Sequence, residues 1–191
     1  GTDVVIGGIM QHIEAAGVHS GDSACVLPPY LLSGPVLEEI RDLTRKFAIE
    51  LGVVGLLNVQ YAINDEVVYV LEVNPRASRT IPFISKMTGV PMVRLGVNAM
   101  LGKTLREQGY EGGLWKKQKA VGVKAPVFSM SKLAGVDTYL GPEMKSTGEV
   151  MGIDHYFPAA LSKALMASGL MLAPQGSILL SIADRDKAES M

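Results

Sequence analysis

The chain has little of what marks secreted, membrane-spanning or nucleic-acid-binding proteins. Cys25 is the single cysteine among 191 residues, which excludes an internal disulfide and with it a disulfide-stapled secreted scaffold. No apolar run approaches the roughly 20 residues that a membrane-spanning helix needs, and no secretory signal pattern opens the chain. The formal net charge of -1 gives no reason to expect nucleic acid or an acidic membrane surface as a partner. We expect a cytoplasmic protein with neither partner.

A lone cysteine could still be a nucleophile. Cys25 lies in the apolar run Ala24–Leu27 and has no local signature of catalysis, so a small buried side chain is the simpler interpretation. Hydrophobic residues make up 48% of the chain and charged residues 19%, a balance typical of a well-packed soluble protein.

Hydrophobic periodicity predicts alternating strands and helices. Apolar residues three or four apart indicate a helix over 35–51, which Ser33 can cap and Gly52 can end. The other expected helices cover residues 80–88, 91–101 and 156–168, and the expected strands cover residues 3–10, 22–28, 56–63, 67–74, 120–128, 148–153 and 177–183. Residues 109–117 are expected to form a surface loop. This order, with a hairpin in it, indicates an α+β (mixed α/β) fold with an antiparallel sheet flanked by helices.

The hairpin strands 56–63 and 67–74 alternate in polarity. Their odd-numbered positions are almost all apolar, which predicts a core face. Polar side chains at even positions are Asn58, Gln60, Glu72 and Asn74.

The turn length decides whether the two polar sets meet. A two-residue turn at 64–65 would place apolar residues opposite polar ones. A three-residue turn at 64–66 pairs like with like and places Gln60 diagonal to Glu72. We therefore predict the three-residue turn, which collects Gln60, Glu72 and Asn74 on one face.

These side chains suit magnesium, which prefers hard oxygen ligands and often takes one or two carboxylates together with substrate phosphates. The alternative is that they face solvent at a strand end or cap the next element. The order Glu72-x-Asn74-Pro75-Arg76, followed by Arg79, resembles the nucleotide-binding signature of ATP-grasp enzymes and favours the metal site. An arginine fork suits phosphoryl oxygens, although both arginines could also be ordinary surface charges.

Longer runs narrow the resemblance. Residues 17–23, 72–80, 85–91 and 141–152 resemble, in order, runs in the large subunits of carbamoyl-phosphate synthetases. Another ATP-grasp ligase, such as a biotin carboxylase or a purine-pathway carboxylate–amine ligase, would share the hairpin but not the 141–152 run. A non-catalytic interaction module is a second alternative.

The resemblance is to the C-terminal half of that subunit and implies three parts. Residues 1–112 would form the C-terminal lobe of the second ATP-grasp module, and residues 113–170 a family-specific extension of it. Residues 171–191 would begin, with the first strand, an allosteric domain of the methylglyoxal-synthase-like α/β type.

The resemblance also implies a function. A glutamine-hydrolysing carbamoyl-phosphate synthase, which serves pyrimidine and arginine biosynthesis, would here use ATP and Mg²⁺ or Mn²⁺ to phosphorylate carbamate. Its partners would be the glutaminase small subunit and the remainder of the large subunit. Nucleotide contacts are implied at Gly17, Val18, His19, Ser20, Gln60 and Glu72, metal coordination at Gln60, Glu72 and Asn74, and catalytic roles for Arg76 and Arg79. Because the opposite lobe of the ATP clamp is missing here, we expect the chain alone to be inactive and to bind ATP weakly.

Overall fold

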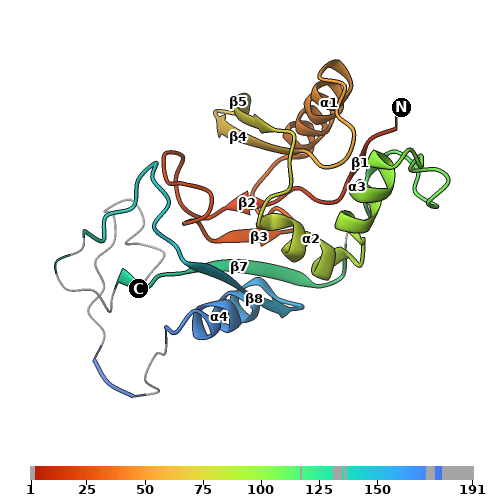
Figure 1. The fold of residues 1–191 in the computed structure, drawn as a ribbon. Coiled ribbons are helices and arrows are strands. Elements are labelled where there is room, and N and C mark those ends of the chain that lie inside the picture. Colours follow the sequence, from red (N-terminus) through yellow and green to blue (C-terminus); the bar gives the residue numbers. More distant parts are fainter. Residues whose placement is uncertain (1–2, 117, 131–134, 136, 171–174, 178–191) are drawn as a thin grey trace.

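The structure, a computed structural model, describes residues 3–116, 118–130, 135, 137–170 and 175–177. Its largest sheet is antiparallel throughout (Figure 1). The strand order is β2 (Gln11–His12), β3 (Cys25–Leu27), β7 (Val121–Val127) and β8 (Gly148–Asp154). The sheet therefore joins two short strands near the start of the chain to two longer ones more than 90 residues later.

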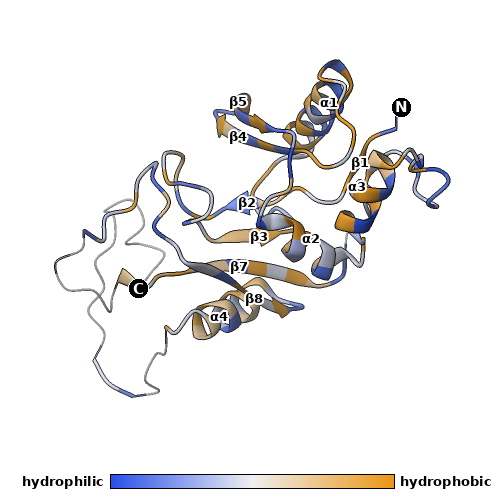
Figure 2. Ribbon diagram, in the orientation of Figure 1, coloured by the Kyte–Doolittle hydropathy of each residue, from blue (hydrophilic) through white to orange (hydrophobic). Residues whose placement is uncertain are grey.

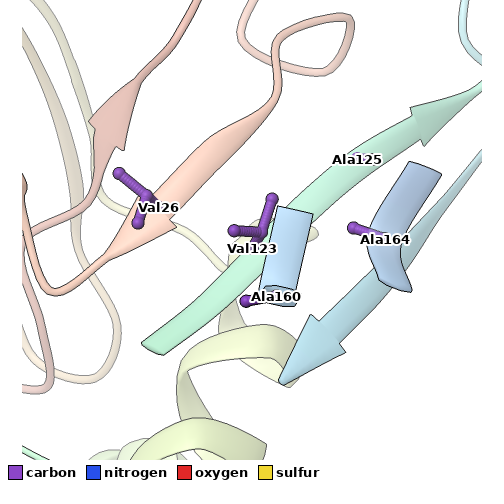
Figure 3. Close-up of a cluster of buried hydrophobic side chains, with 5 residues drawn as sticks. All are labelled: Val26, Val123, Ala125, Ala160 and Ala164. Carbon is purple, nitrogen blue, oxygen red and sulfur yellow. The ribbon is translucent and has the colours of Figure 1, made fainter. Parts of the chain in front are cut away.

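Two helices cover opposite faces of this sheet (Figure 1). α4 (Phe157–Ala167) packs on one face through a cluster of small and branched side chains. Figure 3 shows the buried members of that cluster, which are Val26, Val123, Ala125, Ala160 and Ala164. α2 (Thr80–Thr88) packs on the other face, where Leu27 meets Phe83, Ile84 and Met87. Strand alternation thus gives β7 one face toward each helix.

Gly152 brings α4 close to the sheet. A Cβ atom at this position would overlap the Ala160 carbonyl oxygen and lie 2.5 Å from the Ala164 nitrogen. Both are backbone atoms of the helix, so only glycine lets α4 pack this tightly on β8.

α1 (Gly34–Glu50) begins as the sequence predicts. The Ser33 hydroxyl accepts a hydrogen bond from the Val36 nitrogen at 3.4 Å, and a proline lies in the first turn. The helix carries both hydrophobic and hydrophilic residues (Figure 2). Its Thr44 Oγ1 lies 2.9 Å from the Tyr61 hydroxyl of the neighbouring hairpin. None of the helices in the described ranges is long and apolar enough to span a bilayer.

The remaining elements are β4 (Asn58–Asn64), β5 (Val67–Asn74), α3 (Met92–Met100), β1 (Val5–Ile6) and β6 (Gly113–Leu114). β4 and β5 form the antiparallel hairpin, whereas β1 and β6 pair in parallel. The prediction of a surface loop over 109–117 is therefore wrong in part, because β6 lies inside it. Within the strand expected over 3–10, only Val5–Ile6 is paired, and β2 begins directly after it at Gln11.

The mixed α/β fold with antiparallel sheets and flanking helices is confirmed. The expected strand at 177–183 and the allosteric domain from residue 171 lie outside the described residues, except for residues 175–177. The boundary at residue 112 stays a prediction.

Candidate functional site

A cleft of about 1150 Å³ opens beside the β4–β5 hairpin, larger than the roughly 300–1,000 Å³ of most ligand pockets. Eight of the residues singled out in the sequence line it, namely Gly17, Val18, His19, Ser20, Gln60, Glu72, Arg76 and Arg79. Asn74, the third predicted metal ligand, is not among the lining residues. The structure therefore brings together residues that lie up to about 60 positions apart in the sequence.

The hairpin turn has two residues, so the prediction of a three-residue turn is wrong. Asn64 pairs with Val67, which leaves Asp65 and Glu66 as the turn. Both have positive φ, 49° and 63°, as the central residues of a type I′ turn do. This turn matches the twist of the flanking strands, which explains why it is formed even without glycine.

A β-bulge corrects the register before the strands reach the site. Tyr61 pairs with Val70, whereas Gln60 pairs with Glu72, so Leu71 has no partner on β4. The extra residue shifts β5 by one position. Beyond it, even-numbered residues pair with even-numbered ones, the like-with-like pairing that was expected from an odd-length turn. Gln60 and Glu72 are consequently direct partners rather than diagonal neighbours.

The observed pairing also differs from the prediction in which residues of the hairpin are buried. Val67, Tyr69 and Leu71, which the alternation assigned to a core face, are 51%, 51% and 58% exposed. The prediction of a core face along β5 is therefore wrong for these three residues, because the two-residue turn pairs Val67 and Tyr69 with the even positions Asn64 and Ala62 and leaves Leu71 as the unpaired bulge residue.

The predicted metal ligands form a donor set of one carboxylate and two amides. Asn58 pairs with Asn74 two positions beyond the Gln60–Glu72 pair. Glu72 is exposed, and the Asn74 amide nitrogen is buried without a hydrogen-bond partner in the described part of the chain. No group of three or more His, Cys, Asp or Glu side chains that could hold a metal occurs among the described residues. A cation here would rely on amide oxygens beside the Glu72 carboxylate, which suits magnesium shared with phosphates.

The loop 17–21 is held in one conformation next to the hairpin. Gly17 has a φ of 110°, which favours glycine. His19 Nδ1 accepts a hydrogen bond from the Gly21 nitrogen at 3.0 Å, so in neutral His19 the proton lies on Nε2. The Gln60 side-chain nitrogen donates to Ser20 Oγ at 3.2 Å, which joins the loop to the predicted metal ligands.

Asp22 fastens this loop to residues 141–147. Its carboxylate is completely buried and accepts hydrogen bonds from the Lys145 and Ser146 backbone nitrogens, both at 2.8 Å. Burial opposes ionisation, but these hydrogen bonds hold the pKa of Asp22 below its ordinary value. The Ser146 hydroxyl also donates to the Gly21 carbonyl at 2.8 Å. The 141–152 run, noted in the sequence only as a family resemblance, therefore supports the loop.

The two arginines differ in how they are held. Arg79 precedes α2 and donates from Nη2 to Ser146 Oγ at 3.2 Å, while its Nε lies 3.5 Å from Glu149 Oε1. Arg76 is exposed, and within the described residues its guanidinium donates only to the neighbouring Ala77 carbonyl, at 3.1 Å. Arg79 is thus fixed by the structure, and Arg76 is free to follow a ligand.

Sequence reasoning missed Lys124 and Glu149. Lys124 lies in the middle of the apolar strand β7 and is 1% exposed. A single charged residue at a core position was the available signal, because such a residue is almost never buried without a partner.

Cys25 is a buried side chain, as the simpler interpretation of the sequence predicted. Burial raises the pKa of its thiol to about 12 and leaves the thiol unreactive.

The sequence of this chain matches a known protein family. Residues 2–108 match the model of the carbamoyl-phosphate synthase L chain, ATP binding domain. The chain is 56% identical over 188 residues to the carbamoyl phosphate synthase large chain of Thermomicrobium roseum, covering 98% of this chain and 17% of that protein. It is 56% identical over 191 residues to the same protein of Archaeoglobus fulgidus, covering 100% of this chain and 18% of that protein. The chain therefore spans less than a fifth of the length of these relatives.

Solved structures agree on the fold. A single-chain, multi-domain long-chain acyl-CoA carboxylase matches with a TM-score of 0.60 at 18% identity, over 75% of this chain and 18% of that one. The ADP complex of PurK, an N5-carboxyaminoimidazole ribonucleotide synthetase, matches with a TM-score of 0.57 at 16% identity, over 85% of this chain and 44% of that one. At these identities the likeness extends to the fold alone.

Proposed function

The chain belongs to the carbamoyl-phosphate synthase large-chain family, within its ATP-binding domain, and from this we propose that it forms part of a site that phosphorylates carbamate with ATP. A carbamate oxygen attacks the γ-phosphorus, the bond from that phosphorus to the β,γ-bridging oxygen breaks, and carbamoyl phosphate and ADP result. Such transfer depends on positioning and charge neutralisation. The observation that supports this most directly is the pairing of Gln60 with Glu72 at the cleft.

Glu72, Gln60 and Asn74 are the residues that would hold Mg²⁺ or Mn²⁺. The ion supplies charge neutralisation at the β- and γ-phosphates when it is bound with ATP. The Gln60 amide nitrogen is engaged by Ser20 Oγ at 3.2 Å, which leaves its amide oxygen for a cation. Amide oxygens add no negative charge beside the triphosphate, so one carboxylate suffices.

The loop 17–20 would contact the nucleotide. His19 is held through Nδ1 by the Gly21 nitrogen at 3.0 Å, so its Nε2–H is the donor available to a phosphate or ribose oxygen. Ser20 lies between this histidine and Gln60, and it sets the spacing between the nucleotide loop and the metal ligands.

The arginines would bind the transferring group. Arg79 is oriented by Ser146 and Glu149, which limits the motion of a fork suited to phosphoryl or carboxylate oxygens. Arg76 lines the same cleft and would close on the carbamate or the γ-phosphoryl group once it is bound.

The wider setting is also proposed. The whole enzyme would hydrolyse glutamine on a glutaminase small subunit and supply carbamoyl phosphate to pyrimidine and arginine biosynthesis in the cytoplasm. This segment would belong to the second ATP-grasp module, with residues 1–112, 113–170 and 171–191 divided as the resemblance implies. Since it spans 17–18% of its relatives, we propose that by itself it binds ATP weakly and does not turn over.

The reverse half-reaction tests the proposal. A full-length large chain that carries this segment is expected to make ATP from ADP and carbamoyl phosphate in the presence of Mg²⁺. Glu72→Gln is expected to lower its kcat by about 10²-fold or more and to raise the Mg²⁺ concentration needed for half-maximal rate. Glu38→Gln, on the solvent side of α1, is the matched control and should leave both unchanged. A wild-type enzyme without the half-reaction, or Glu72→Gln with wild-type behaviour, would overturn the proposal.

A further inference from the structure

A continuous series of polar contacts runs from a predicted metal ligand to a predicted catalytic arginine. The Gln60 side chain donates to Ser20 Oγ at 3.2 Å. The Ser20 carbonyl accepts from Lys124 Nζ at 3.0 Å, and the same Nζ donates to Glu149 Oε1 at 3.2 Å. Glu149 Oε1 in turn lies 3.5 Å from Arg79 Nε. Lys124 and Glu149 are the two members of this series that have no role in the proposed function.

Lys124 is placed where a charge is costly. It lies on the face of β7 that also bears Gly122, whose missing side chain makes room for Met87 of α2. Its side chain is 1% exposed, and a buried ammonium without a counter-charge strongly destabilises a protein. Its two contacts, one to a carboxylate and one to a carbonyl, therefore fix the position of Nζ.

Glu149 lies between two cations. It is on β8, two residues before Met151, which pairs with Lys124 in the register. Its side chain is 13% exposed, Lys124 is at 3.2 Å, and Arg79 is at 3.5 Å. The shared carboxylate contacts the arginine through Nε. Other N–H groups of the guanidinium are therefore left to donate to a ligand.

We propose that Lys124 and Glu149 are positioning residues for phosphoryl transfer, the glutamate orienting Arg79 and the lysine fixing both Glu149 and the Ser20 carbonyl. This inference rests on the proposed function. An apolar pair would fill the same space without the desolvation of two charges, but Arg79 would lose its contact with Glu149 and the Ser20 carbonyl its contact with Lys124.

The two residues act on different parts of the reaction. Glu149 contacts Arg79 and Lys124 but no residue of the nucleotide loop, and a glutamine in its place can still accept from Lys124, so its replacement should affect transfer more than nucleotide affinity. Lys124 also holds the Ser20 carbonyl, so its loss loosens the nucleotide loop as well. A purely structural ion pair would show neither pattern, since its loss would lower the amount of folded enzyme and leave the kinetic constants of that fraction unchanged.

The test uses the full-length large chain and synthesis of ATP from ADP and carbamoyl phosphate, with active sites counted by calorimetric titration with MgADP. Glu149→Gln is expected to lower kcat per site by about 10- to 100-fold and to change KM for MgADP less than about twofold. Lys124→Met is expected to lower kcat and also to raise KM for MgADP by about fivefold or more. Lys163→Met, which removes an ion pair with Asp154 on the same strand β8 at 2.7 Å, is the matched control and should behave as wild type.

The double variant Lys124→Met/Glu149→Leu keeps the test decisive where a single variant does not fold. Replacing both buried charges is expected to restore folding and MgADP titration, while kcat per site stays at least about tenfold below wild type. Wild-type kcat in Glu149→Gln or in the folded double variant would overturn the positioning role. A wild-type enzyme without ATP synthesis would instead refute the proposed function, so the two failures are distinguishable.

Discussion

Gln60 and Glu72 are direct cross-strand partners although the hairpin that joins their strands has a two-residue turn. Continued regularly from the pair of Asn64 with Val67, the ladder would place Leu71 opposite Gln60. The bulge at Leu71 moves the carboxylate into that position instead. An irregularity in one strand thus decides whether an apolar or an acidic side chain faces the amide at the cleft.

The first prediction concerns the turn that sets this register. Glu66 has a φ of 63° and contacts Ser33 through its side chain. Glu66→Gly and Glu66→Ala both remove that contact, but only glycine adopts positive φ without steric cost. We expect the glycine variant to be the more stable by about 1 kcal/mol. Native-state hydrogen exchange of the β4 and β5 amides in the full-length enzyme measures the difference, and equal protection in the two variants would contradict a type I′ turn.

The positions of the helices and strands could be predicted because they depend on local patterns. The apolar spacing over 35–51 and the cap at Ser33 place α1 to within a residue or two of its observed bounds. The register of the hairpin could not be obtained in this way. Two-residue and three-residue turns both suit a polar Asn64–Glu66 segment, and the alternation along β5 does not mark the position of the bulge.

The candidate site shows the same difference between features that depend on local patterns and features that depend on long-range contacts. Most of the predicted site residues fall in two short runs, 17–20 and 72–79, which the sequence shows directly, whereas the contact of Gln60 with Ser20 brings the loop to the hairpin. Lys124 and Asp22 each make a contact with a segment more than 100 residues away, Ser20 in one case and Ser146 in the other. Periodicity places each on a strand or a loop and gives no partner.

The second prediction tests the packing of α4 on the sheet. Gly152→Ala forces a methyl group against backbone atoms of Ala160 and Ala164, which cannot rotate away. We expect it to lower the free energy of unfolding by about 1–3 kcal/mol or more. Gly148→Ala, on the same strand, has only Val127 Cβ at 3.8 Å and should be tolerated. Thermal denaturation of the two variants provides the comparison, and equal midpoints would contradict the close approach of α4 to β8.

The third prediction separates the charge of Arg79 from its shape. Arg79→Lys keeps the positive charge but cannot span Ser146 and Glu149 with a planar fork. We expect kcat for ATP synthesis from ADP and carbamoyl phosphate to fall by about 10- to 100-fold, with little change in KM for MgADP. Arg45→Lys, at an exposed position of α1, is the control. Undiminished turnover in the Arg79 variant would mean that charge alone is required.

The fourth prediction concerns Asp22 and pH. Its folded-state pKa is lowered by the hydrogen bonds from the Lys145 and Ser146 nitrogens, so ionised Asp22 contributes stability that is fully present above the unfolded value of about 4. That contribution is lost as the pH falls from about 4 toward the lower folded pKa. Protection of the two amides against hydrogen exchange should therefore decrease over this range in the wild-type enzyme.

Asp22→Asn should remove the pH dependence and the protection together. An asparagine offers one acceptor oxygen where the carboxylate offers two, so one buried N–H of the 145–146 pair loses its partner, at a cost of about 1–3 kcal/mol. Asp42→Asn, at an exposed position of α1, should leave exchange at these amides unchanged. Because the same contacts hold loop 19–22 beside Ser146, KM for MgADP is expected to rise in Asp22→Asn at neutral pH. Unchanged protection with unchanged KM would mean that residues 141–147 do not support the nucleotide loop.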